Sequence, residues 1–283
     1  MKTLALKKIS RSFVFLFVGL LFFVNCTSNS QEDEIIDDTT EEPVDDTTDD
    51  PDDTTTEPSE TDYDISAILS VFSEHSSVVT YEISGNNVII STTNLPNHTS
   101  PYYLDTAWHD DLYEAYNGTN NAFNLNPNRI GEQDITFTIP LHPEAASTNE
   151  ETPMGPMGIS RNGVVFFNQY AAGRSALDGE INSFDQYLGH PTGTSAYHYH
   201  IEPTYLTTTY GEDALLGLLA DGFPVYGPKE NDVTISSQDL DEFHGYYGAT
   251  LEFPDGIYHY HITADDPYIN GDGFYGTPGN ISR

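Results

Sequence analysis

Tyr197-His198-Tyr199-His200 and Tyr258-His259-Tyr260-His261 are the same four residue types, and they close the two halves of an internal duplication. Tyrosine alternating with histidine favours an extended strand, where successive side chains point to opposite faces. The histidines of each string then share one face and the tyrosines share the other. If the two strands lie side by side, four imidazoles converge. The sequence therefore predicts one metal site formed by His198, His200, His259 and His261.

The segments that precede the two strings also match. Residues 158–168 and 217–227 each contain an apolar strand, an Asn-Gly or Asp-Gly turn and a second apolar strand, which is a hairpin pattern. A polar loop with an acidic residue follows in each case, and then Gly189-His190 or His244-Gly245. Half-repeats of about 156–200 and 215–261 predict two units about a pseudo-twofold axis. We expect that axis to bring the histidine strands together.

The composition favours β structure with many turns, because tyrosine, phenylalanine, glycine and proline are abundant (19, 15, 22 and 17 residues). We predict a mainly β fold over residues 65–283, a single antiparallel β-sandwich-like domain. The formal net charge is −36. Binding to a phosphate backbone needs clustered Lys and Arg, so we expect no nucleic-acid partner.

The N-terminus has the pattern of an export signal. Basic residues precede a short apolar run, 12–24, which is too short to span a bilayer needing ~20 residues. The run ends at Cys26, the only cysteine in the chain. This arrangement resembles the lipobox of bacterial lipoproteins. We therefore predict a signal peptide at 1–25 and lipidation of Cys26, with an ordinary cleaved signal as the alternative.

The segment 26–64 is predicted to be a disordered acidic tether. Residues 31–64 hold 17 acidic and no basic side chains, so they cannot bury apolar surface and should repel one another. Acidic residues close to a lipidated cysteine resemble the surface-export signals of some Bacteroidota lipoproteins. We expect a protein of the bacterial cell envelope, anchored by Cys26 to the outer membrane and facing outward. The sequence identifies no protein partner.

Residues 222–228 (Gly-Phe-Pro-Val-Tyr-Gly-Pro), the two Tyr-His-Tyr-His strings and the aromatic C-terminal segment to Gly276 together resemble the YHYH domain of secreted proteins. The resemblance covers about residues 78–280 and implies no established activity. Where the family has a second Gly-His step, this chain has Gly245-Tyr246, which leaves His190 without a counterpart. Any twofold-symmetric site is therefore expected to be unequal in its surroundings.

The histidine pattern suits a transition metal, and we expect copper or zinc, since imidazole is a good ligand for both. Metal-bound histidines usually donate their second N–H to a carboxylate or carbonyl. The acidic residues that recur in the two halves are candidates for that supporting role, as are two histidines beside glycines. This supporting set is Asp185, His190, Asp221, Asp241 and His244.

Three alternatives remain open at this stage. The histidines can be hydrogen-bonded core residues of a structural or adhesive surface module. The domain can instead be a metal-dependent enzyme of unknown substrate, with an open coordination position and a pocket lined by the segment 99–130. The turn at Asp265–Gly273 offers oxygen ligands for calcium, but it lacks the spacing of the known helix-loop-helix motif. No nucleophile motif indicates metal-free catalysis.

Overall fold

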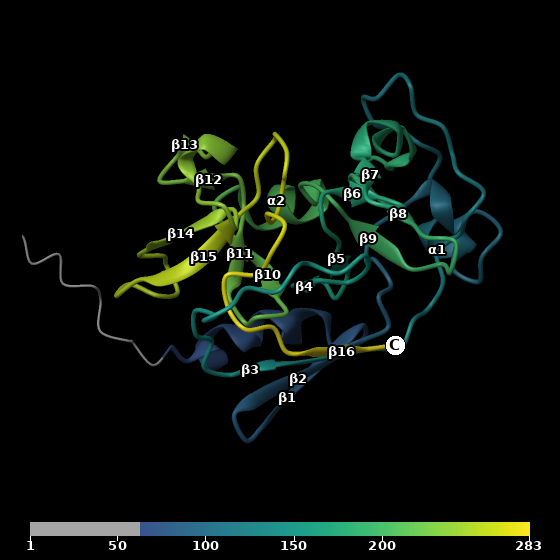
Figure 1. The fold of residues 1–283 in the computed structure, drawn as a ribbon. Coiled ribbons are helices and arrows are strands. Elements are labelled where there is room, and N and C mark those ends of the chain that lie inside the picture. Colours follow the sequence, from purple (N-terminus) through teal and green to yellow (C-terminus); the bar gives the residue numbers. More distant parts are fainter. Residues whose placement is uncertain (1–62) are drawn as a thin grey trace, which may run out of the picture. The chain divides into compact units, whose positions relative to one another are not determined.

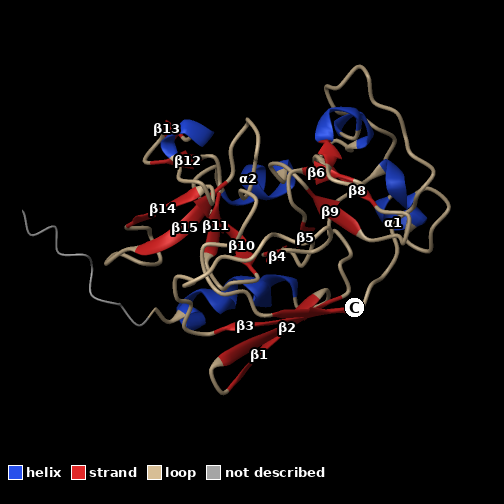
Figure 2. Ribbon diagram, viewed as in Figure 1, coloured by secondary structure: helices blue, strands red, loops and turns tan. Residues whose placement is uncertain are grey.

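The computed structural model describes residues 63–283, which form a mainly β fold with two large sheets (Figures 1 and 2). The mainly β prediction is confirmed. The signal peptide, Cys26 and the tether as far as residue 62 lie outside the described residues. Within 63–283, no helix is both long enough and apolar enough to cross a membrane.

The larger sheet has eight strands. In spatial order they are β14 (Gly245–Gly248), β15 (Ile257–His261), β11 (Pro224–Tyr226), β10 (Leu215–Leu219), β4 (Gly158–Ser160), β5 (Val165–Phe166), β9 (Tyr197–Tyr199) and β8 (Gly189–Pro191). Each half contains a hairpin, a parallel neighbour and an antiparallel edge strand. The antiparallel pair β4–β10 joins the two halves in the middle.

This topology corrects the expectation of a wholly antiparallel fold. β9 runs parallel to β5, and β15 runs parallel to β11. In each half a long segment leads from the hairpin to the antiparallel edge strand, so the Tyr-His-Tyr-His strand that follows the edge strand runs in the direction of the hairpin strand with which it pairs. The sheet is therefore mixed, and it is not closed into a barrel.

The expectation that the two histidine strands meet is wrong. Between β9 and β15 lie the strands β5, β4, β10 and β11. At about 4.8 Å per strand, the two strands are roughly 24 Å apart. The reason is that the hairpins, whose strands are buried throughout, pair at the centre of the sheet, so the returning strands are left toward its ends (Figure 1).

The smaller sheet is antiparallel, in the order β1 (Val79–Ser84), β2 (Asn87–Thr92), β3 (Ile135–Pro140) and β16 (Asn280–Ser282). The helix η1 (Ile65–His75) lies between this sheet and the larger one, and Asp64 caps its first turn (Figure 2). Apolar side chains of η1, of β2 and β3, and of β4, β5 and β10 form one continuous core.

Short elements complete the described chain, most of them in the loops that flank the ends of the large sheet. They are η2 (Pro101–Tyr103), α1 (His109–Leu112), β6 (Tyr170–Ala171), β7 (Ser175–Ala176), η3 (Leu177–Gly179), η4 (Ile181–Ser183), α2 (Thr204–Tyr210), β12 (Lys229–Glu230), β13 (Val233–Thr234) and η5 (Ser237–Asp239).

The alternation predicted for the two strings is confirmed. Tyr197 and Tyr199 are fully buried in a second core on the far face of the large sheet, together with Tyr258 and Tyr260. The histidines face the other way, since His198 pairs in the register with Val165, which belongs to the core that includes η1. A glycine on the edge strand makes room for the first tyrosine in each half. A Cβ at Gly189 would lie 2.5 Å from the Tyr197 ring, and one at Gly245 would lie 2.6 Å from Tyr258.

Candidate metal centre

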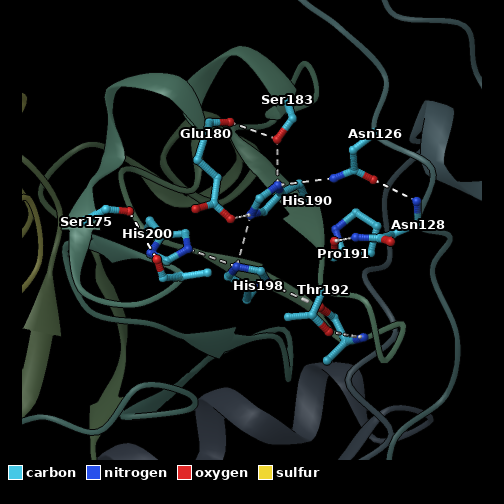
Figure 3. Close-up of polar contacts among 12 residues, drawn as sticks. Asn126, Asn128, Ser175, Glu180, Ser183, His190, Pro191, Thr192, His198 and His200 are labelled. Atoms are coloured by element: carbon cyan, nitrogen blue, oxygen red, sulfur yellow. Dashed lines mark hydrogen bonds and ion pairs between the residues drawn. The ribbon is translucent and has the colours of Figure 1, made fainter.

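One cluster in the described residues brings three histidines and a carboxylate together. Glu180, His190, His198 and His200 each offer a ligand atom, and these atoms all lie within 4.8 Å of one another (Figure 3). His190 comes from β8, His198 from β9 and His200 from the residue that follows β9 by one position, while Glu180 lies in the loop between η3 and η4. The three imidazoles are at most 3% exposed.

The Nε2 atoms point inward. His190 Nε2 lies 3.1 Å from His198 Nε2, and His198 Nε2 lies 2.9 Å from His200 Nε2. His190 Nε2 also lies 3.2 Å from the Oε1 atom of Glu180. These contacts connect the three Nε2 atoms and one carboxylate oxygen, which are four potential ligand atoms.

The Nδ1 atoms point outward, and their partners fix where the protons are. His198 Nδ1 lies 3.1 Å from the carbonyl oxygen of Ala196, and His200 Nδ1 lies 2.5 Å from that of Asn168. A carbonyl oxygen only accepts, so both Nδ1 atoms donate. Their Nε2 atoms therefore carry lone pairs when the imidazoles are neutral.

His190 is held in a similar way. Its Nδ1 atom lies 2.7 Å from the hydroxyl of Ser183, and that hydroxyl donates to the carbonyl oxygen of Glu180 at 2.8 Å. The hydroxyl oxygen is thus left as an acceptor for the Nδ1–H of His190. All three imidazoles present Nε2 to the centre of the cluster.

Lone pairs at 2.9 Å repel unless a cation lies between them. A proton is a poor candidate at neutral pH, since burial lowers the pKa of His200 to about 4. Burial and the neighbouring imidazoles of His190 and His200 hold the pKa of His198 well below its usual value. The side chain of His190, whose Nε2 atom contacts Oε1 of Glu180, lowers the pKa of that carboxyl group, which favours the carboxylate. With the Nδ1–H groups of His198 and His200 committed to carbonyl oxygens, the cluster offers imidazole lone pairs beside a carboxylate, which is a ligand set for a metal ion.

Three of the six distances among the ligand atoms are close to those around a tetrahedral ion. Nitrogen ligands at about 2.05 Å from zinc lie about 3.3 Å from one another. The three contacts along the cluster, 3.1, 2.9 and 3.2 Å, are within a few tenths of an ångström of that value. The carbonyl and hydroxyl partners of Nδ1 are of the kind that orient metal-bound histidines. This cluster could hold a metal.

A cavity of about 640 Å³ opens beside the cluster and is lined by all four of its residues. Asn126 and Asn128, from the segment 99–130, line the same cavity, together with Met154, Phe167 and Tyr170. Asn128 is held by the carbonyl oxygen of Pro191 at 3.0 Å. The cluster therefore faces a space large enough for a small molecule.

His259 and His261 do not reach this cluster and form a separate pair at the other end of the sheet. Their Nδ1 atoms donate to the carbonyl oxygens of Ile257 and Gly227, at 3.0 and 2.8 Å. Tyr246 lies opposite His259 in the strand register, as His190 lies opposite His198. The duplication thus places two imidazoles at each end, and only the first end has a third.

Residues 136–236 and 229–273 match the family model described as YHYH protein. The chain belongs to the YHYH family over residues 136–273. No curated protein and no solved structure matches the chain. The resemblance noted from the two strings is thereby confirmed, and both ends of the large sheet lie within the YHYH domain.

The three aspartates of the supporting set lie on the tyrosine face of the YHYH domain. Asp185 accepts hydrogen bonds from Tyr197, at 2.9 and 3.0 Å, and Asp241 accepts one from Tyr258 at 2.9 Å. Asp221 accepts one from Tyr260 at 2.5 Å. Burial raises the pKa of Asp185 and of Asp221 to about 6. Backbone carbonyls, and not these carboxylates, orient the imidazoles.

The two supporting histidines have different places. His190 Nε2 is itself one of the ligand atoms of the cluster, a more direct position than the sequence suggested. His244 is buried with φ +73°, and its Nε2 contacts the hydroxyl of Thr263 at 2.9 Å. It occupies the turn before β14, where Leu188 with φ +65° stands in the first half. His244 is thus remote from the cluster.

Glu180 was missed by sequence reasoning. It stands half-buried in a polar loop of the YHYH domain, close to the exposed Asp178. The only sequence signal is its position in the loop that leads to Asp185. That signal does not separate Glu180 from Asp178, two residues earlier.

Proposed function

We propose that the first half of the YHYH domain binds a transition-metal ion, copper or zinc, at Glu180, His190, His198 and His200. The observation that carries this proposal is the 2.9 Å contact between two Nε2 atoms whose Nδ1–H groups are both committed to carbonyl oxygens. A bound cation converts that repulsion into two coordinate bonds. Imidazole ligands favour zinc and copper over magnesium and calcium.

The test is metal analysis of the purified chain after dialysis against metal-free buffer. We expect about one zinc or copper ion per chain, and X-ray absorption dominated by nitrogen ligands. His198→Ala combined with His200→Ala should abolish it. His109→Ala is the matched control, because that side chain is half-exposed and lies outside the cluster. A wild-type chain that holds no ion and does not take up added zinc or copper would contradict the proposal.

The structural alternative predicts a different result. A module whose histidines serve only as hydrogen-bonded core would lose stability on the same substitutions and would contain no metal as purified. His200→Gln separates the two functions, because glutamine can still donate to the carbonyl oxygen of Asn168 but is a poor metal ligand. We expect this variant to stay folded by circular dichroism and to lose the ion.

A second candidate function is metal-dependent catalysis, which the cavity of about 640 Å³ beside the cluster favours. A catalytic ion keeps a coordination position for water or substrate. The cobalt-substituted chain reports this position, since an added monodentate anion such as azide changes the visible spectrum only if it reaches the ion. An unchanged spectrum would favour a closed, structural ion.

We also propose that Cys26 carries a lipid that anchors the chain to the outer membrane of a bacterial envelope, with the acidic segment as a spacer. The supporting observations are the short apolar run and the lone cysteine that follows it. Metabolic labelling with a fatty acid should mark the wild-type chain and not Cys26→Ala. Equal labelling of the two would contradict the anchor.

A further inference from the structure

The second half of the YHYH domain contains two buried imidazoles whose Nε2 atoms have no hydrogen-bond partner within residues 63–283. His259 and His261 are 0% and 2% exposed, and their Nε2 atoms have no hydrogen-bond partner among the described residues. Their Nδ1–H groups are used by backbone carbonyls, so each Nε2 carries a lone pair. Buried polar atoms are nearly always satisfied, and two such atoms on one strand require an explanation.

Both imidazoles line a cavity of about 430 Å³, distinct from the one in the first half. Glu230 lines the same cavity and comes from the loop that corresponds to the loop of Glu180. Burial lowers the pKa of both imidazoles, and the charge of the nearby Glu230 carboxylate opposes that shift. Lys229 is also at this cavity, where its ammonium group is engaged by Glu212 at 2.6 Å.

Tyr246 takes the place of the third imidazole. Its ring is parallel to that of His261 at 5.5 Å, and its hydroxyl donates a short hydrogen bond to the carboxylate of Glu230. In the first half, His190 contacts Glu180 in the same relation. The second half therefore offers two nitrogens and one carboxylate, and a tyrosine positions the carboxylate.

We propose that the second half binds its own divalent transition-metal ion through His259, His261 and Glu230, with Tyr246 as a positioning residue. Two imidazoles and one carboxylate leave coordination positions open toward the cavity, a set that suits ferrous iron and similar ions. Tyr246 holds one carboxylate oxygen of Glu230, and on binding the other oxygen turns toward the imidazoles, since among residues 63–283 only the first cluster has three such atoms within 4.8 Å. This site does not depend on the function proposed for the first.

Equilibrium dialysis of the full chain against cobalt(II) alone, with metal analysis, tests the second site. We expect two ions per chain. His261→Gln and Glu230→Gln should each remove or weaken by about tenfold the binding of one ion and leave the other unchanged. His200→Gln should do the reverse. Two ions that respond to neither His261→Gln nor Glu230→Gln would place the second ion elsewhere and overturn the proposal.

Tyr246→His provides a gain of function that does not rely on a damaged fold. It adds an imidazole opposite His259, as His190 stands opposite His198. We expect the second ion to bind about tenfold more tightly in this variant. A wild-type chain that takes up one ion at most, with that ion lost in His200→Gln, would overturn the second site while supporting the first. A single ion that is lost only in His261→Gln would support the second site and overturn the first.

Discussion

The two halves of the large sheet share a strand plan and differ in the groups at its ends. In each half a hairpin is followed by a returning Tyr-His-Tyr-His strand and an antiparallel edge strand. In each half an aspartate holds the first tyrosine, and carbonyl oxygens hold both Nδ1 atoms. The first end has three imidazoles and the second has two with a tyrosine. The aspartates and carbonyl oxygens that the halves share hold the strand in place. The edge-strand residue, His190 in one half and Tyr246 in the other, determines which donor atoms each end offers to a ligand.

The largest expected effect is a difference in the stability cost of replacing Asp185 and Asp241, which each hold the first tyrosine of their half. Asp185 is fully buried and accepts hydrogen bonds from Tyr197, from Ser100 and from two backbone N–H groups, whereas Asp241 is exposed. Asp185→Ala leaves buried donors unpaired and should lower the free energy of unfolding by about 4 kcal/mol. Asp241→Ala should cost about 1 kcal/mol. Urea titration at pH 7 measures both, and equal costs would show that the two halves are stabilised alike.

The second prediction concerns the second tyrosine of each string. In the first half Tyr199 contacts Nε2 of buried His98, whose pKa is lowered to about 4 by burial. In the second half Tyr260 donates to Asp221, whose pKa is raised to about 6 by burial. As pH falls from 6.5 to 4, the unfolded state protonates His98 first, so stability is lost. As pH falls from about 6 to 3.8, the native state protonates Asp221 first, so stability is gained.

His98→Gln and Asp221→Asn isolate these opposite contributions. Relative to the wild type, His98→Gln should become more stable on acidification, and Asp221→Asn less stable, each by up to about 3 kcal/mol. The measurement is urea titration of metal-free protein at pH 7, 5 and 4. Curves that run parallel to that of the wild type would mean that neither group titrates differently on unfolding.

Metal addition should distinguish the two ends. Zinc at about 100 times its dissociation constant stabilises a chain that binds it only when folded by about 2.7 kcal/mol per site. We expect His200→Gln to lose the part that is due to the first site, and His261→Gln to keep it. Thermal unfolding with zinc and with a chelator checks this. The reverse pattern would make the second end the stronger site.

The smallest effect is that of a single charge. Glu180→Gln keeps a polar group beside His190 but removes the anionic ligand. The three imidazoles remain, so we expect zinc affinity to fall by about tenfold, or 1.4 kcal/mol, without loss of stoichiometry. Competition with a chromogenic chelator measures the change. An unchanged affinity would mean that Glu180 lies outside the coordination sphere.

Sequence reasoning predicted the local features correctly and the long-range pairing incorrectly. The alternation of tyrosine and histidine and the hairpins within 158–168 and 217–227 follow from side-chain periodicity and turn residues, which act within a few positions. The same pattern cannot show which strands become neighbours. The strands β4 and β10 pair at the centre of the sheet because the hairpins that contain them are buried. This pairing separates histidines that occupy the same positions in the two Tyr-His-Tyr-His strings.

The candidate site was predicted to the extent that it follows from the first string. His198 and His200 lie at the cluster, and the loss of a histidine at Tyr246 was visible as an irregularity of the repeat. Glu180 and the carbonyl oxygen of Asn168 could not be found, because one lies in an irregular loop and the other is backbone. Such groups have no spacing that distinguishes them in a sequence.

The antiparallel junction of β4 with β10 has a consequence for how the two ends could diverge. Because four strands separate one pair of imidazoles from the other, we expect a substitution at one end to leave the donor atoms at the other end in place. A change of the edge-strand residue at Tyr246 is therefore expected to leave the donor atoms at His190 in place. The two ends of one sheet can in this way be altered independently of each other.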